Sequence, residues 1–269
     1  MKKIKVLIKK IVPKSVLGYF TGFIYGWRGN YSSWEEAKRK CSGYNSPAIL
    51  EKVRDSALLV KKGLAPYERD SVVFDKVQYS FPLLAGLMWI AAQNNGKLNV
   101  LDFGGSLGST FHQNKFFLNT LDYVRWCIVE QPDFVRTGID SFSDDVLHFY
   151  YSIDDCFKEN NIDIILLSSV LQYLESPFDI LNHIKLKRIK YIIIDRTPFI
   201  KGRDRITIQK VHPKIYNASY PCWFFNKTKF LDSIIGDYDM IMEFNSLDEA
   251  NIVSEFKGFL FEQNPGKKR

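Results

Sequence analysis

Short apolar runs alternate with helix-like segments from Leu98 onward. Each run is nearly continuous in apolar residues, as expected for strands that are buried on both faces of a sheet. Helical segments between the runs indicate parallel strands in a doubly wound α/β sheet. Two later runs flank a turn-rich stretch and could pair antiparallel. The predicted strands are Leu98–Phe103, Trp126–Glu130, Val146–Tyr150, Ile162–Ser168 and Tyr191–Asp195, followed by the pair Tyr238–Phe244 and Phe256–Glu262.

The pattern before Leu98 is helical. Ser33 and Glu36 have the spacing of a capping box, and Ser46-Pro47 is typical of a helix start, with Gly63 ending that helix. Another apolar helix is predicted from Phe81 to Gly96, after a polar connection over residues 65–70. We therefore expect an N-terminal helical cap, residues 31–97, on a Rossmann-like domain, residues 98–269, of five parallel strands plus a terminal antiparallel pair.

Residues 1–30 form a basic arm. They contain seven Lys and Arg side chains and no acidic side chain, so their charge of +7 equals the net charge of the whole chain. The charges of residues 31–269 therefore sum to zero, with 30 basic against 30 acidic side chains. Apolar residues recur at i, i+3, i+4, i+7 and i+8 from Ile4 to Val12, and Pro13 should end this helix. Lysines beside an apolar stripe, followed by aromatic residues, suit an anionic membrane surface contacted through residues 1–27. A helix packed on the body is the alternative.

Composition narrows the class of protein. With 269 residues, 46% of them hydrophobic, the chain can bury a substantial core, and its electrically neutral body argues against a nucleic-acid partner. No apolar run is long enough for a membrane-spanning helix. Four dispersed cysteines without a C-x-x-C pair exclude a disulfide framework and suit a reducing cytoplasm. No ligand spacing points to a metal. The expected location is the cytoplasm, peripheral to the inner membrane face if the arm binds lipid.

The sharpest local signal is a glycine turn between a strand and a helix, residues 100–109, VLDFGGSLGS. Small residues let a ligand approach the backbone, and the following helix offers free N–H groups. The turn lacks the G-K-[ST] of a phosphate-binding loop and the G-x-G-x-x-G of dinucleotide sites. Asp102 would repel a pyrophosphate and attract a sulfonium or ammonium, by roughly 4 kcal/mol at about 4 Å. A cationic cofactor without phosphates is therefore favoured.

Glu130 ends the second predicted strand, 28 residues after Asp102 (130 − 102). Doubly wound folds place an acid there to bind ribose hydroxyls. The alternative is a turn made for packing beside a surface glutamate.

These residues resemble motifs of class I S-adenosylmethionine-dependent methyltransferases. Residues 102–108, DFGGSLG, are similar to D-x-G-x-G-x-G, with Ser106 in place of the middle glycine. Residues 163–174 are similar to the fourth-strand motif, with Gln172 where many members carry histidine. More closely, the chain resembles, over about residues 30–262, a family of bacterial methyltransferases associated with surface-polysaccharide gene clusters. The shared stretches are ERDS (68–71), FGGSLGS (103–109), SSVLQYL (168–174), DRTPF (195–199) and ASYP (218–221).

The resemblance implies S-adenosylmethionine as cofactor, bound over the carboxyl ends of the first four strands. Ser168 would lie beneath the reactive methyl group. By the same logic the methionine part would face Asp102, Gly104, Gly105 and Gly108, the ribose would contact Glu130 and Gln131, and the adenine edge would contact Ser152 and Ile153.

An insertion over residues 196–227 follows the fifth strand and is rich in aromatic residues. Tyr216 and Tyr220 could contact a sugar ring, or the aromatic residues could form a small core, with residues 223–225 at its centre. A hydroxyl acceptor needs a base, and Asp195 and His212 are the two candidates. Asp195 could instead pair with the next residue or cap a turn, and His212 could face solvent.

Arg69 is a candidate for a phosphate on a nucleotide-sugar or lipid-linked substrate, although a salt-bridge cluster with Glu68 and Asp70 is the preferred interpretation. Taken together, the sequence predicts an S-adenosylmethionine-dependent methyltransferase that modifies a hydroxyl of a sugar or lipid-linked glycan. A non-catalytic binding module on the same fold and an NAD-dependent sugar oxidoreductase are the alternatives.

Overall fold

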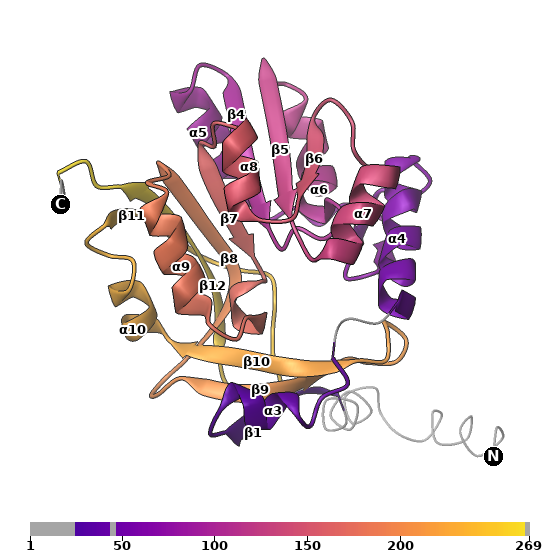
Figure 1. Ribbon diagram of the computed structural model, residues 1–269, viewed down its shortest axis with the longest axis vertical. Coiled ribbons are helices and arrows are strands. Elements are labelled where there is room, and N and C mark those ends of the chain that lie inside the picture. The colour runs from indigo at the N-terminus through magenta and orange to yellow at the C-terminus, as the bar shows by residue number, and fades with distance from the viewer. Residues whose placement is uncertain (1–24, 44–46, 267–269) are drawn as a thin grey trace.

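A computed structural model describes residues 25–43 and 47–266, and the helix predicted near the N-terminus lies outside them. The five predicted parallel strands are confirmed, and they lie in the order β6-β5-β4-β7-β8 (Figure 1). This is the order of the doubly wound fold, with the first strand of the sheet at its centre. The strands are β4 (Lys97–Phe103), β5 (Tyr123–Val129), β6 (Leu147–Tyr150), β7 (Ile164–Ser168) and β8 (Tyr191–Ile200).

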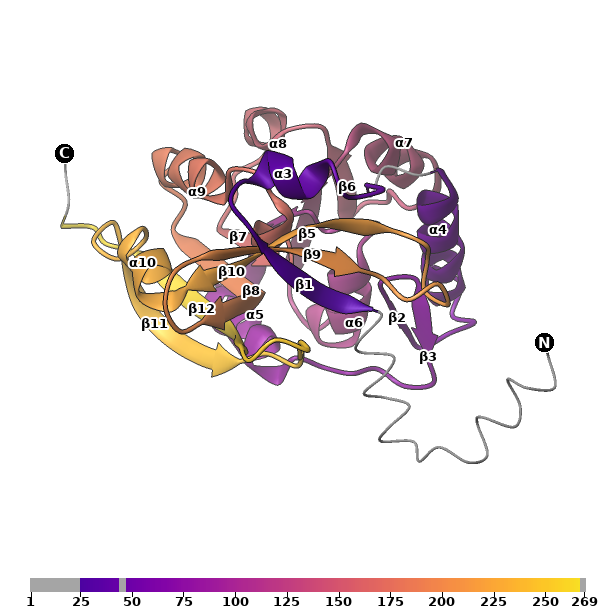
Figure 2. The same ribbon diagram turned by 90° about the horizontal axis from the view of Figure 1, so that it is seen from below.

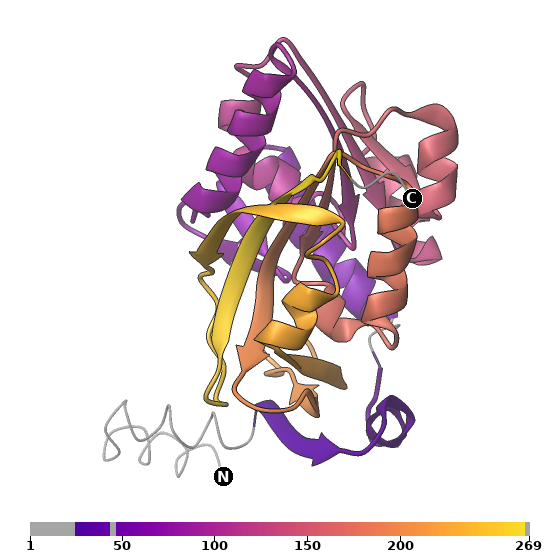
Figure 3. The ribbon, with the colours of Figure 1, turned by 90° about the vertical axis from the view of Figure 1, so that its left-hand side faces the viewer.

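Helices cover both faces of the sheet, with two hydrophobic clusters between (Figure 3). Val100 and Leu101 are neighbours on β4 and belong to opposite clusters, because successive strand residues point to opposite faces. On the face of Val100 lie α4 (Pro47–Lys61), α5 (Phe81–Gln93), α6 (Ser109–Leu118) and α7 (Pro132–Ser141). On the face of Leu101 lie α8 (Ile153–Glu159), α9 (Pro177–Leu186) and α10 (Lys227–Asp232). None of the described helices is both long and apolar enough to cross a bilayer.

The expected terminal pair is also confirmed. Strands β11 (Tyr238–Asn245) and β12 (Glu255–Gln263) pair antiparallel, and β12 pairs antiparallel with β8. The connection between β11 and β12 runs past the end of β8, so it brings polar residues to the edge where the parallel strands end.

The cap contains a short hairpin besides its helices. Ser33 caps α3 (Trp34–Lys38) by accepting from the Glu36 amide at 3.1 Å, as predicted. Where a polar connection was expected, strands β2 (Tyr67–Arg69) and β3 (Val72–Phe74) pair around a two-residue turn. Both turn residues have left-handed backbone, with φ of 52° at Asp70 and 64° at Ser71. Strands of three residues are too short to leave a readable alternation in the sequence.

The insertion after β8 is a hairpin rather than a loop. Its strands β9 (Arg205–Lys210) and β10 (Ser219–Asn226) pair antiparallel, and β1 (Gly26–Tyr31) adds to β9, so the boundary expected after residue 30 falls within a strand. Figures 1 and 2 show these strands running across the carboxyl ends of the parallel strands. The predicted aromatic core is present, because Phe224 and Phe225 are fully buried and the Trp223 ring stacks on Trp34.

Gly138, in the buried face of α7, offers a test of the packing. An added Cβ would lie 2.3 Å from Cδ1 of Phe149. Helix propensity alone predicts that Gly138→Ala stabilises the protein by about 1 kcal/mol. We expect instead a loss of about 1–3 kcal/mol in the free energy of unfolding, because the methyl overpacks the core. Urea unfolding measures it, and the loss should shrink in a Phe149→Leu background. A variant more stable than wild type would contradict this packing.

Candidate active site

The glycine turn lies at the end of β4. Backbone φ is +74° at Gly104 and +95° at Gly108, values that L side chains rarely adopt. A Cβ on Gly104 would lie 2.5 Å from Cγ2 of Val170, and a Cβ on Gly105 would lie 2.5 Å from Cγ of Asp102. Ser106 also has positive φ, 56°, at the position where the methyltransferase motif carries glycine. The backbone of the turn thus has the form that the motif predicts.

Asp102 lies beneath the turn and is 1% exposed. Its Oδ2 accepts a hydrogen bond of 3.0 Å from Nε1 of Trp126. Burial raises the pKa of Asp102 to about 7, and the nearby Glu130 adds to the rise while the Trp126 bond opposes it. Its carboxyl lies against Gly105, so the backbone of the turn separates it from the outer face of the turn.

Glu130 lies on the other side of the turn, just beyond β5. Its carboxylate accepts hydrogen bonds from the backbone N–H groups of Gln131 (2.6 Å) and Ser106. Burial raises the pKa of Glu130 despite these bonds. The structure therefore brings Glu130 to the glycine turn, as the sequence predicts. Gln131 is exposed at the N-cap of α7.

The adenine candidates have structural roles for their side chains. The Ser152 hydroxyl accepts from the Asp155 amide at 3.0 Å and caps α8. Ile153 is 5% exposed and packs in the cluster beneath α8. Contacts with an adenine would therefore come from their backbone.

Ser168 ends β7 and pairs with Asp195, which is the last residue of β8 paired with β7 although β8 continues to Ile200, beyond the predicted strand end. Both residues line one cavity of about 40 Å³. The hairpin β2–β3 contributes Arg69 to the same cavity, and the start of α6 contributes Ser109. Further lining residues are Tyr67, Ser80, Leu83, Thr110, Gln113, Arg196 and Leu247. Thus three predicted site residues meet, from the cap and from two strands.

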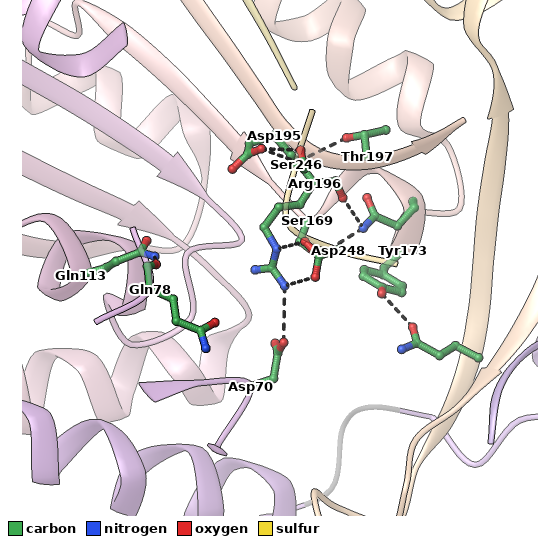
Figure 4. A network of polar contacts seen from close by, with 12 residues as sticks. Asp70, Gln78, Gln113, Ser169, Tyr173, Asp195, Arg196, Thr197, Ser246 and Asp248 are labelled. Atoms are coloured by element: carbon green, nitrogen blue, oxygen red, sulfur yellow. Dashed lines mark hydrogen bonds and ion pairs between the residues drawn. The ribbon is translucent and has the colours of Figure 1, made fainter. Parts of the chain in front are cut away.

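A polar network holds Asp195 in place (Figure 4). Its Oδ1 accepts from the Ser246 hydroxyl at 2.7 Å and from the backbone N–H of Arg196 at 2.8 Å. The carboxyl is 1% exposed, and burial raises its pKa. The expected alternative, a pair with the next residue, is realised only through that backbone bond, since the guanidinium binds elsewhere.

The Arg196 guanidinium joins three segments of the chain (Figure 4). Its Nε lies 2.6 Å from Oδ2 of Asp248, in the β11–β12 connection, and its Nη2 lies 3.5 Å from Oδ2 of Asp70, in the hairpin turn. Gln172 donates from Nε2 to the Arg196 carbonyl and to the Ser169 hydroxyl, both at 3.1 Å. Arg196, Asp248 and Gln172 are not among the predicted site residues, although Arg196 lies in the shared stretch DRTPF and Gln172 in SSVLQYL.

The preferred interpretation of Arg69 is wrong. Glu68 accepts from the Ser109 hydroxyl and Asp70 pairs with Arg196, so no Glu68–Arg69–Asp70 cluster forms. The Arg69 guanidinium lies over the Phe74 ring, 5.9 Å from its centroid, and among the described residues it forms no ion pair. It is therefore available to a ligand in the cavity.

The second candidate base, His212, and the substrate candidates Tyr216 and Tyr220 lie on the β9–β10 hairpin, outside the cavity lining. Nδ1 of His212 accepts from the Lys214 amide at 3.1 Å, and its ring packs on Tyr25. The hydroxyls of Tyr216 and Tyr220 lie 3.3 Å apart. Burial raises the pKa of Tyr216 to about 12, so this phenol stays neutral.

A scan against protein-family models finds no match, and a search of the curated proteins finds none either. Among solved structures, the N-terminal domain of EvdMO1, in the presence of SAH and D-fucose, is similar with a TM-score of 0.46 and 11% identity, covering 82% of this chain and 98% of that one. Magnesium protoporphyrin IX methyltransferase from Synechocystis PCC 6803, with bound SAM, gives 0.45 and 10%, covering 82% and 100%. The glycopeptide N-methyltransferase MtfA, complexed with SAM, gives 0.45 and 7%, covering 67% and 87%. Similarity at this level does not identify a substrate.

The pKa of Asp102 can be tested through stability. In the folded protein it lies at about 7, above its value in the unfolded chain. The stabilisation is therefore complete at pH below the unfolded pKa of about 4 and is lost as pH rises through about 7. Asparagine does not ionise, and its amide oxygen can still accept from Trp126. Relative to Asp102→Asn, the wild type should lose about 3 kcal/mol of unfolding free energy between pH 5 and pH 8.

Urea unfolding at the two pH values measures this difference. The other buried acids are present in both the wild type and the variant, so their contributions to the pH dependence of unfolding largely cancel in the difference. A difference between the proteins that stays constant with pH would show that Asp102 ionises normally in the folded state.

Proposed function

We propose that this protein is an S-adenosylmethionine-dependent methyltransferase. The observation that carries the proposal is the combination of a glycine turn with two carboxyl groups against it, the buried Asp102 and the half-buried Glu130. Asp102 and Glu130 form no ion pair with any of the described residues 25–43 and 47–266. Uncompensated acid groups beside a backbone cradle favour a cationic ligand without phosphates.

The residues fit this cofactor. Glycine at positions 104 and 105 lets the side chains of Val170 and Asp102 pack directly against the turn, because a Cβ at either position would lie 2.5 Å from them, and it leaves the backbone of the turn without side chains of its own. Glu130, at the end of the second strand, is placed to accept from both ribose hydroxyls, and Asp102 supplies negative charge beneath the methionine part. Gly108, Gln131, Ser152, Ile153 and Ser168 complete the proposed cofactor site. When bound, S-adenosylmethionine supplies an electrophilic methyl group.

The cavity must enlarge to admit ligands. Its volume of about 40 Å³ is far below the roughly 300–1,000 Å³ typical of ligand pockets. Its walls come from the β2–β3 hairpin of the cap and from the strand ends. A shift of the hairpin away from Ser168 and Asp195 is the direct way to open it.

We propose a hydroxyl on a sugar or lipid-linked glycan as the acceptor, with Asp195 as general base. Asp195 shares the cavity with Ser168, where the methyl group would arrive, and with Arg69, which is suited to a phosphate on the acceptor. Burial raises the pKa of the Asp195 carboxyl above its ordinary value, which makes the carboxylate a stronger base. His212, Tyr216 and Tyr220 remain candidates for contacts with a larger acceptor. The motif resemblance to methyltransferases of surface-polysaccharide gene clusters supports this acceptor class.

The basic arm gives a proposed location. Its lysines and apolar stripe support contact with the anionic inner face of the cytoplasmic membrane, where lipid-linked glycans would be within reach.

Cofactor binding can be measured directly by calorimetric titration with S-adenosylhomocysteine, with NAD as the comparison ligand. We expect micromolar binding of S-adenosylhomocysteine and none of NAD. Glu130→Gln should weaken binding by about tenfold, because charge-assisted hydrogen bonds to the ribose become neutral ones. The absence of binding at millimolar S-adenosylhomocysteine, with the protein folded, would refute the proposed cofactor.

Asp195→Asn tests the base. The amide oxygen can keep the Ser246 bond, so the network should persist while proton removal is lost. We expect kcat to fall by about 10²–10⁴-fold on an acceptor found by screening nucleotide sugars and glycan extracts. Affinity for S-adenosylhomocysteine should stay within about twofold. A variant with unchanged kcat would assign the base elsewhere, and His212→Asn is then the variant to compare.

A further inference from the structure

We infer that Glu68, on the cap hairpin, binds the α-ammonium group of the cofactor. This inference rests on the proposed function and adds a binding residue from outside the parallel-strand domain. Of the residues derived from the motifs, Asp102 is the one assigned to the methionine part, and it acts from beneath the turn without a direct contact proposed to the ammonium group.

The hairpin places the Glu68 carboxyl at the start of α6. Strand β2 is held by pairing with β3, in the register Glu68↔Val73, and Tyr67 beside it is 3% exposed. Oε1 of Glu68 accepts a hydrogen bond from the hydroxyl of Ser109, the first residue of α6 after the glycine turn. Ser109 lines the same cavity as Ser168. Glu68 therefore reaches the start of α6 from the cap, next to the cavity rather than in its lining.

Only one oxygen of the Glu68 carboxyl accepts a side-chain hydrogen bond. The residue is 2% exposed, and its Oε2 is buried without a well-formed hydrogen bond, although the backbone N–H of Ser71 lies close enough to lower the pKa of the carboxyl. Burial raises the pKa of Glu68 to about 7, and the negative charge of Asp70 adds to this rise. A buried acceptor without a hydrogen bond costs free energy of folding. In native proteins such groups normally bind a protein donor, a ligand or a water molecule.

No cation of the described residues fills this gap. The neighbouring Arg69 lies over Phe74, and Arg196 is taken by Asp248 and Asp70. Among residues 25–43 and 47–266, Glu68 forms no ion pair.

An ammonium group matches these requirements. It carries a positive charge and three donors, so it can satisfy Oε2 while Ser109 keeps Oε1. The start of α6 has no side-chain cap, so its backbone N–H groups are suited to the carboxylate of the same amino-acid part. Glu68 and the helix start together form a site for a zwitterion.

Three ligands separate this inference from the proposed function, by calorimetry at pH 8. S-adenosylhomocysteine carries both ammonium and carboxylate, decarboxylated S-adenosylmethionine carries only the ammonium, and 5′-methylthioadenosine carries neither. We expect Glu68→Gln to weaken the first two by at least about tenfold and to leave 5′-methylthioadenosine within about twofold of wild type. Glu51→Gln, an exposed substitution on the adjacent α4, is the matched control and should change none of them.

Ser109→Ala is the control for a loss of binding that comes from a disturbed hairpin and not from the lost carboxylate charge. It removes the bond to Oε1 but keeps the carboxylate, so it should retain binding of S-adenosylhomocysteine within about threefold. Thermal unfolding of each variant confirms folding. Equal weakening of all three ligands by Glu68→Gln, or unchanged affinity for all three, would overturn the inference while wild-type binding still supports the proposed cofactor. No binding to wild type would instead reject the proposed function.

Discussion

The ion pair between Arg196 and Asp248 fixes the edge where the chemistry is proposed. Arg196 ends the regular part of β8, and Asp248 lies in the connection between β11 and β12. Opposing carboxylates raise the pKa of Arg196, so the guanidinium keeps its charge although it is only 20% exposed. The same group reaches Asp70 of the cap hairpin. Removing it would leave the half-buried Asp248 without its partner and the buried Asp195 without a nearby cation, so one guanidinium links the cap hairpin, the sheet and the β11–β12 connection.

Backbone strain concentrates at the same edge. Asp70, Ser71, Ser106, Ser169 and Arg196 are non-glycine residues with left-handed backbone, between 52° and 64° in φ. Each costs free energy that the surrounding contacts must offset, and such strain clusters at functional sites. Here the offsetting contacts are visible, since Gln172 binds both Ser169 and Arg196. The strain therefore positions side chains around a common cavity rather than reflecting loose packing.

The parallel sheet and the glycine turn were predictable because both leave strong local patterns, apolar runs in one case and fixed glycine spacing in the other. The two hairpins were not, because β2 and β3 have three residues each and β9 and β10 lie in a segment of mixed composition. The expected cluster of Glu68, Arg69 and Asp70 failed for a geometric reason. Successive residues of a strand point to opposite sides, so adjacent charges in sequence do not meet when the segment is extended.

The cap hairpin is part of the site and not merely a cover over it. Asp195 reaches the cavity from the sheet, whereas Glu68 and Arg69 reach its surroundings from β2, more than a hundred residues earlier in the sequence. The parallel-strand domain alone would keep the glycine turn but would lose one wall of the cavity and the partner of Ser109. If the hairpin moves to admit ligands, the Asp70–Arg196 pair must break, and the charge of the cofactor can compensate by satisfying Glu68. On the proposed function, ligand binding would therefore be coupled to the docking of the cap through the acids with raised pKa values, which are Glu68, Asp102 and Glu130.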